Sequence, residues 1–166
     1  MGFQWQDLGD IEVGRPTLGA MTSVLMYRLM QFTLKDTINA QFGEEKADKL
    51  FYQAGELAGK ELYKNILSDV KDLDQLVSQL TDLLQDQKIG IFEVEQVDLE
   101  KNEFVFAVSE DLDCSGLPDT EEAKCSFDEG LIAGILSGFL NKEVSVKEVD
   151  CWGTGDKTCR FEAKFK

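Results

Sequence analysis

The sequence contains no histidine. Without an imidazole, the chain cannot form a Ser-His or Cys-His nucleophile pair, a histidine-ligated haem iron or an imidazole general base. Most common hydrolytic mechanisms are therefore excluded.

Long apolar runs and basic residues are also scarce. No apolar run reaches the roughly 20 residues that a membrane span needs, and the N-terminal stretch MGFQWQDLGD lacks the basic and apolar regions of a signal peptide. The chain has 32 acidic against 17 basic residues, a formal net charge of -15, so its surface should repel phosphate backbones and anionic lipids. We expect a cytoplasmic protein with no membrane span and no nucleic-acid partner.

The first half of the chain has the pattern of helices. The 166 residues, 43% of them apolar, suit a single domain over 1–166. After an irregular or strand-like start that ends at Arg15-Pro16, apolar residues at helical spacing predict helices over 17–42 and 44–67. A third helix is expected after Ser68, its predicted N-cap.

The second half alternates apolar and polar residues. The stretches IGIFEVEQV and NEFVFAVS predict an antiparallel hairpin, followed by an acidic loop over 109–124. Ser126 and Glu129 predict a capping box that opens a glycine-spaced helix, and EVSVKEVDC with TCRFEAKF predicts a closing hairpin. The expected fold class is α+β, with N-terminal helices packed on an antiparallel sheet built from two hairpins.

Four cysteines are the strongest chemical signal in the sequence. In a cytosolic chain, such clustering indicates a metal site or reactive thiols. Cys125 precedes a helix, where the dipole favours a thiolate, and Cys151 and Cys159 face each other in the closing hairpin. Tetrahedral zinc needs four ligands, and the fourth would come from Cys114 or a carboxylate. Ordinary buried thiols, or a disulfide between Cys151 and Cys159, are the alternatives.

Strand alternation suggests how a carboxylate would join these thiols. Val146 lies on the inner face of its strand, which puts Glu148 inward as well, whereas Cys151 is out of phase. A β-bulge near 149–150 would reset the alternation and let Glu148, Cys151 and Cys159 converge. We therefore predict a bulge at this point.

The C-terminal third, DEGLIAGILSGFL and then VSVKEVDCWGTGDKTCRFEA, resembles the 4-vinyl reductase domain family through its E-x-x-C-x-x-x-G-D-x-x-C-x-F pattern. The stretch KADKLFYQAGELAGKEL is similar to the family's second helix. In relatives that serve as sensor domains of aromatic-responsive transcription activators, a cysteine, a glutamate and two further cysteines hold zinc. The resemblance implies a structural zinc held by Cys125, Glu148, Cys151 and Cys159. Cys114 falls outside the pattern, as an unliganded thiol or an alternative ligand.

The resemblance also implies a mixed α/β ligand-binding fold, similar to those of vesicle-tethering subunits and haem-based nitric oxide sensors. Glycines every four residues, at 55 and 59 and at 130, 134 and 138, form grooves on two helices. These grooves serve either close helix packing or a ligand or subunit contact. Candidates for lining a hydrophobic ligand cavity are Met26, Met30, Phe51, Tyr52, Phe92, Phe104 and Phe106.

The favoured function is a zinc-containing sensor or regulatory domain, homodimeric, that binds a hydrophobic or aromatic small molecule. One alternative is an accessory protein of tetrapyrrole metabolism, either a substrate carrier or a reductase. Another is a scaffold subunit filled by an acyl chain. We identify no catalytic residue: no G-x-G-x-x-G joins a strand to a helix, and a four-ligand zinc leaves no open position for substrate.

Overall fold

The computed structural model describes residues 2–98, 100–119 and 125–165. The helices are η1 (Trp5–Leu8), α1 (Ile11–Gly14), α2 (Val24–Phe42), α3 (Glu44–Leu62), η2 (Tyr63–Leu67), α4 (Leu73–Asp86), α5 (Ser126–Leu140) and η3 (Trp152–Thr154). The strands are β1 (Ile91–Asp98), β2 (Glu103–Ser109), β3 (Val144–Asp150) and β4 (Thr158–Phe165). Among the described residues, no helix is both long and apolar enough to cross a membrane.

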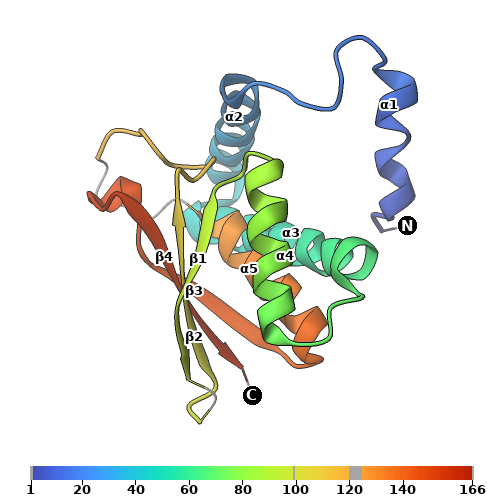
Figure 1. Cartoon of the computed structure of the whole chain (residues 1–166). Coiled ribbons are helices and arrows are strands. Elements are labelled where there is room, and N and C mark those ends of the chain that lie inside the picture. The colour runs from blue at the N-terminus through green and yellow to red at the C-terminus, as the bar shows by residue number, and fades with distance from the viewer. Residues whose placement is uncertain (1, 99, 120–124, 166) are drawn as a thin grey trace.

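The sheet has four antiparallel strands in the order β1-β2-β4-β3. The two hairpins therefore meet through β2 and β4, and helices α3, α4 and α5 gather on one side of the sheet (Figure 1). Segment α1 stands apart from this body and is joined to α2 by an extended stretch (Figure 1). The predicted α+β class, with helices on a sheet of two hairpins, is confirmed.

Several predicted helix starts were wrong. Residues 17–23 precede α2, whose first turn is capped by Ser23 accepting the N–H of Met26. Helix α4 begins after Asp72, which accepts the N–H of Gln75. Ser68 is not the N-cap because the preceding helix continues as the π-helix η2 up to Leu67.

The predicted capping box at α5 was also wrong. Cys125 is the N-cap, and Ser126 is the first helical residue. The Ser126 hydroxyl donates instead to Asp48 at 3.0 Å, and Glu129 accepts the backbone N–H of Glu148 at 2.8 Å. Partners from α3 and β3 thus replace the local pair.

The glycine grooves serve close packing between α3 and α5. A Cβ atom added to Gly130 would lie 2.0 Å from the carbonyl oxygen of Tyr52, and one added to Gly55 would lie 2.0 Å from that of Phe127. Such distances leave no room for any side chain. Of the two interpretations of the spacing, helix packing is therefore confirmed at Gly55, Gly59, Gly130 and Gly134.

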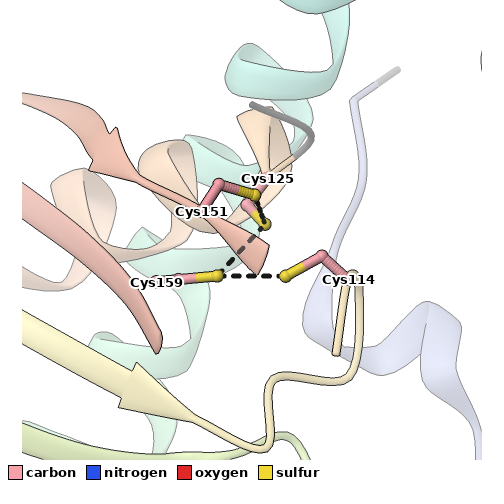
Figure 2. A group of neighbouring side chains, drawn as sticks. All are labelled: Cys114, Cys125, Cys151 and Cys159. Atoms are coloured by element: carbon pink, nitrogen blue, oxygen red, sulfur yellow. Dashed lines mark hydrogen bonds between the residues drawn. The ribbon is translucent and has the colours of Figure 1, made fainter. Parts of the chain in front are cut away.

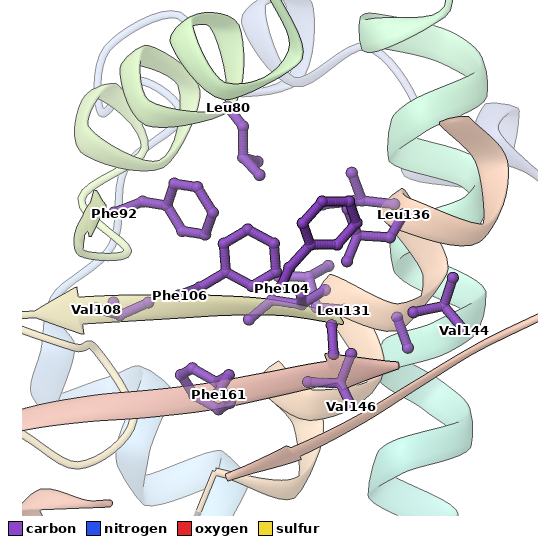
Figure 3. Close-up of a cluster of buried hydrophobic side chains, with 14 of the residues drawn as sticks. Leu80, Phe92, Phe104, Phe106, Val108, Leu131, Leu136, Val144, Val146 and Phe161 are labelled. Carbon is purple, nitrogen blue, oxygen red and sulfur yellow. The ribbon is translucent and has the colours of Figure 1, made fainter. Parts of the chain in front are cut away.

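The core lies between the sheet and helices α4 and α5 (Figure 3). Phe92 stacks on Phe106 with ring centroids 5.2 Å apart, and Phe104 stacks on Phe165 at 5.3 Å. Helix α4 covers this layer with three buried leucines, Leu76, Leu80 and Leu84. Each fully buried side chain of this size stabilises the fold by roughly 1.5–3 kcal/mol.

Candidate metal centre

Four thiols from distant parts of the chain meet in the interior (Figure 2). Cys114 lies in the loop after β2, Cys125 caps α5, Cys151 follows β3 and Cys159 lies in β4. Each is at most 1% exposed. Their Sγ atoms all lie within 4.8 Å of one another, so the group could hold a metal ion.

The spacing of the sulfurs can be compared with that of a tetrahedral metal site. Zn–S bonds of about 2.3 Å place two thiolates about 3.8 Å apart. The Sγ atom of Cys125 lies 3.8 Å from that of Cys159 and 3.9 Å from that of Cys151. Cys114 and Cys159 are closer, at 3.0 Å, and would have to move apart slightly around an ion.

A β-bulge brings Cys151 into this group. Glu148 pairs with Phe161 and Asp150 pairs with Arg160, so Val149 is the extra residue. Val149 is 46% exposed, whereas Glu148 and Cys151 are both buried. The predicted bulge is confirmed, and its effect is the predicted reset of alternation.

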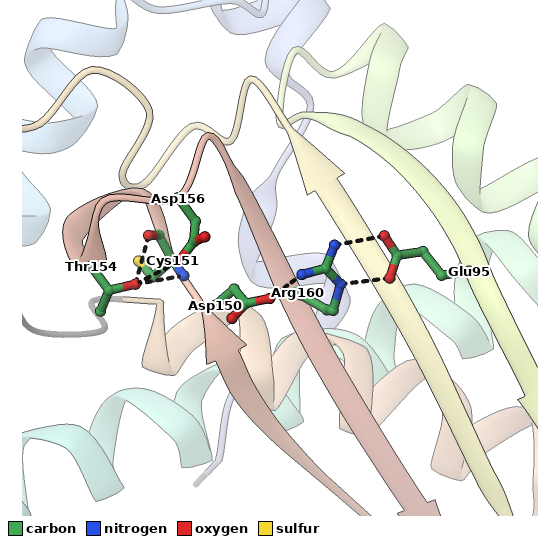
Figure 4. Close-up of polar contacts among 6 residues, drawn as sticks. All are labelled: Glu95, Asp150, Cys151, Thr154, Asp156 and Arg160. Carbon is green, nitrogen blue, oxygen red and sulfur yellow. Dashed lines mark hydrogen bonds and ion pairs between the residues drawn. The ribbon is translucent and has the colours of Figure 1, made fainter.

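The turn after β3 fixes the backbone of Cys151 (Figure 4). The Thr154 hydroxyl accepts the N–H of Cys151 at 3.1 Å and donates to its carbonyl oxygen at 2.8 Å. On the other side of the bulge, Arg160 forms ion pairs with Asp150 and Glu95. The backbone that presents Cys151 is therefore tied to the neighbouring strand and to its own turn.

The loop that presents Cys114 is held by α2. Arg28 donates to the carbonyl oxygens of Leu112 at 2.7 Å and Ser115 at 2.9 Å. Asp111 accepts the N–H of Cys114 at 3.2 Å. Sequence spacing gave no indication of this geometry, because α2 lies far from the loop along the chain.

Glu148, the carboxylate implied by the resemblance, lies beside the thiols. Its Oε2 atom accepts the N–H of Cys125 at 3.2 Å. Its Oε1 atom is buried and has no hydrogen-bond partner among the described residues. Burial, followed by the charge of Cys151, raises the pKa of Glu148 to about 8. Glu148 is not a member of the four-sulfur group, and its role as a ligand stays a prediction.

The thiols themselves resist ionisation in the absence of a cation. Neighbouring Cys114, Cys151 and Cys159, together with burial, raise the pKa of Cys125 far above its usual value. The pKa of Cys159 shifts in the same direction, chiefly through Cys114. A metal ion would reverse this preference, because thiolates coordinate it as their protons leave.

The seven residues predicted to line a ligand cavity are not brought together. Phe92, Phe104 and Phe106 are buried in the core, and Phe51 is buried under the ammonium of Lys35. Tyr52 is half-buried and accepts the N–H of Val146. Met26 and Met30 are 56% and 62% exposed.

A small cavity does lie under α4. Its volume is about 10 Å³, and it is lined by Leu73, Leu76, Val77, Leu80, Phe92, Phe106, Ile132, Ile135 and Leu136. This space is about that of one water molecule. Only Phe92 and Phe106 of the seven predicted residues line it.

Known proteins provide a comparison for this geometry. The protein MJ0150 of Methanocaldococcus jannaschii is 34% identical over 108 residues, which are 65% of this chain and 61% of that protein. This chain thus spans less than two thirds of the length of that relative.

Two solved structures have similar folds. The phenol-responsive sensory domain of the transcription activator PoxR, solved with phenol, has a TM-score of 0.65 and 19% identity, covering 88% of this chain and 76% of that one. A vinyl-4-reductase family protein of Methanocaldococcus jannaschii has a TM-score of 0.64 and 21% identity, covering 100% and 99%. At these identities the likeness is one of fold.

The family assignment comes from the C-terminal part of the chain. Residues 104–165 match the sequence model of the 4-vinyl reductase domain. This segment contains α5, the closing hairpin and most of β2, and it includes all four clustered cysteines. The resemblance is confirmed, and through residues 104–165 the chain belongs to the 4-vinyl reductase domain family.

Proposed function

We propose that this protein is a zinc-containing sensor or regulatory domain that binds a hydrophobic or aromatic small molecule. The observation that carries the proposal is the group of four buried thiols, built on the bulge and helix start of a 4-vinyl reductase domain. The cytoplasm is the proposed compartment, because reducing conditions keep such thiols available to a metal.

The spacing of the sulfurs favours a single zinc ion. All four Sγ atoms lie within 4.8 Å of one another. A [4Fe–4S] cluster would hold its thiolates farther apart, around a cube of iron and sulfide. Four thiolates fill the tetrahedral coordination of zinc, so the ion would be structural and would tie the 111–115 loop and α5 to the closing hairpin.

The fourth ligand is the point at which two proposals differ. We propose Cys114 together with Cys125, Cys151 and Cys159, because these are the atoms that lie closest together. The resemblance implies Glu148 in place of Cys114, and the unpartnered Oε1 atom of Glu148 supports that alternative. Cobalt(II) in place of zinc distinguishes them, because its charge-transfer absorption grows with the number of thiolates. Cys114→Ser would weaken this absorption if Cys114 is the ligand, whereas Glu148→Gln would leave it unchanged.

The ligand is proposed to enter beneath α4. Helices α3 and α5 cannot separate without losing the close backbone contact at their glycines. Helix α4, in contrast, rests on the core through a row of leucines above an existing apolar cavity. The π-helix η2 leads into it, and such irregular turns are frequent at functional sites. PoxR was solved with phenol, which supports a small aromatic ligand for this site.

A second copy of the chain is the proposed partner of α2. Large apolar side chains are exposed on α2 and on the segment before it: Leu18, Met21, Val24, Leu25, Met26, Leu29 and Met30. Exposed patches of this kind indicate interaction sites. A homodimer would be seen by light scattering during size-exclusion chromatography, and Leu25→Glu would dissociate it.

The first experiment measures metal content and thiol reactivity of the untagged chain. Zinc should co-purify, and all four thiols should react only after denaturation or chelation. Cys151→Ser should lose zinc and melt at a lower temperature, because metal binding contributes to folding. Val149→Ala, at the exposed bulge position, is the matched control and should keep its zinc. Metal-free protein whose melting temperature is unaffected by Cys151→Ser would refute a structural zinc.

A further inference from the structure

Three carboxyl groups lie buried next to the four thiols. Asp111 and Asp113 are each 2% exposed, and Asp128 is 8% exposed. Asp111 and Asp113 lie in the loop that carries Cys114, and Asp128 lies in the first turn of α5. Buried carboxylates require hydrogen-bond donors or cations as partners, so the partners of each one matter.

Asp113 is fully engaged by α2. Tyr27 donates to its Oδ1 atom at 2.8 Å, and Gln31 donates to its Oδ2 atom at 2.6 Å. These donors account for both oxygens of Asp113 and hold the carboxylate towards α2.

Asp111 and Asp128 are less completely satisfied. The Oδ1 atom of Asp111 accepts the N–H groups of Asp113 at 2.8 Å and Cys114 at 3.2 Å. The Oδ2 atom of Asp128 is buried and has no hydrogen-bond partner among the residues that the structure describes. An orphaned carboxylate oxygen in the interior is costly and calls for a cation or a bound molecule.

These two carboxylates converge on one of the thiols. A carboxylate oxygen of Asp111, one of Asp128 and the Sγ atom of Cys125 lie within 4.8 Å of one another. Cys125 belongs to the four-sulfur group as well. A thiolate sulfur has enough lone pairs to bridge two metal ions.

The arrangement of charge supports a second ion. One divalent ion does not balance four thiolates, and the buried carboxyl groups lie beside them. Arg28, the basic residue from α2 that reaches this loop, directs its hydrogen bonds to backbone carbonyls. A second divalent cation would neutralise the carboxylates where this arginine does not.

We propose that Asp111, Asp128 and Cys125 form a second divalent-cation site, with the Cys125 sulfur bridging it to the four-thiol site. Its ligands are two carboxylates and one shared thiolate, a donor set that suits zinc. The second ion would link the start of α5 to the Asp111 loop independently of Cys151 and Cys159. This inference rests on the proposed zinc site only for the shared sulfur.

The test counts the ions bound by the whole, metal-free chain as cadmium is added. Native mass spectrometry gives the number of ions, and thiolate-to-cadmium absorption reports on the sulfurs. We expect two ions in the natural sequence and one in Asp128→Asn and Asp111→Asn, with most of the thiolate absorption kept. Binding at the second site should weaken at least tenfold in each variant.

Glu129→Gln is the matched control. Glu129 lies next to Asp128 and is equally buried, at 7% exposed, but accepts from Glu148 and Lys147. It should still bind two ions. Two carboxylate variants, checked for folding by circular dichroism, guard against one that fails to fold.

The outcomes also separate this proposal from the proposed zinc site. One ion in the natural sequence, unaffected by either carboxylate variant but lost in Cys159→Ser, would refute the second site alone. One ion lost in Asp128→Asn but kept in Cys159→Ser would support the carboxylate site and refute the four-thiol site. No bound ion would refute both.

Discussion

The hydroxyl of Tyr27 donates a hydrogen bond of 2.8 Å to Asp113, the residue before Cys114. Burial and the neighbouring Asp113 raise the pKa of Tyr27, so its hydroxyl remains a donor. Tyr27→Phe should lower the free energy of unfolding by about 1.5–3 kcal/mol, as expected for a hydrogen bond to a charged group. Hydrogen exchange of α2 and of residues 111–115 should become faster, and urea unfolding measures the loss.

Thr37→Val is the control on the same helix. Its hydroxyl is exposed and bonds within α2, to the carbonyl oxygen of Thr33. The change should shift stability by no more than about 0.5 kcal/mol. If Tyr27→Phe leaves exchange of both segments unchanged, α2 is not held through Asp113.

A second prediction concerns the contact between α3 and α5. Glycine to alanine in a helix normally adds roughly 1 kcal/mol of stability. Gly130→Ala should instead destabilise, because its Cβ atom would lie 2.0 Å from the carbonyl oxygen of Tyr52. We expect a loss of several kcal/mol, beyond the range of most single substitutions, measured by urea unfolding. Gly14→Ala, where nothing lies within 4 Å of the added atom, should cost little; similar costs at both positions would contradict the packing argument.

Local patterns in the sequence were sufficient for much of this fold. Alternation predicts both hairpins, and the phase conflict between Glu148 and Cys151 predicts the bulge that the register confirms. Glycine spacing marks the faces where α3 and α5 touch. These features depend on residues close together in the chain, where periodicity carries the information.

The fourth sulfur and the buried acids were beyond such patterns. Cys114 lies in an irregular loop whose path is set by Arg28 and Tyr27 of α2, and no spacing rule links them. Asp128 falls in the first turn of a helix, where an acidic residue is ordinary. Its burial and unpartnered oxygen become apparent only in three dimensions.

A third prediction is a dependence of stability on pH at Asp48. Burial acts to raise its pKa, but Lys35 at 2.7 Å and the Ser126 hydroxyl outweigh burial, so the pKa of Asp48 is lowered. A lowered pKa contributes stability above the unfolded value of about 3.9, and this contribution disappears as the pH falls through the folded value. Since Asp48 is half-exposed, Asp48→Asn should cost under about 1 kcal/mol at pH 7 and less near pH 3.

Urea unfolding at both pH values checks this dependence. Asp36→Asn, an exposed position on α2, is the control and should change little at either. An equal cost of Asp48→Asn at pH 7 and pH 3 would mean that its charge does not contribute.

The last prediction tests whether the space under α4 accepts an aromatic molecule. Phe106 lines the cavity of about 10 Å³ and stacks on Phe92. Phe106→Ala should lower the free energy of unfolding by about 3–5 kcal/mol, because it enlarges an apolar cavity. Dry apolar cavities of the enlarged size bind benzene, so benzene should raise the melting temperature of this variant. Phe106→Leu, which keeps most of the volume, should lose less stability and respond less to benzene. An equal response of the two variants would place benzene elsewhere and weaken the case for a ligand site beneath α4.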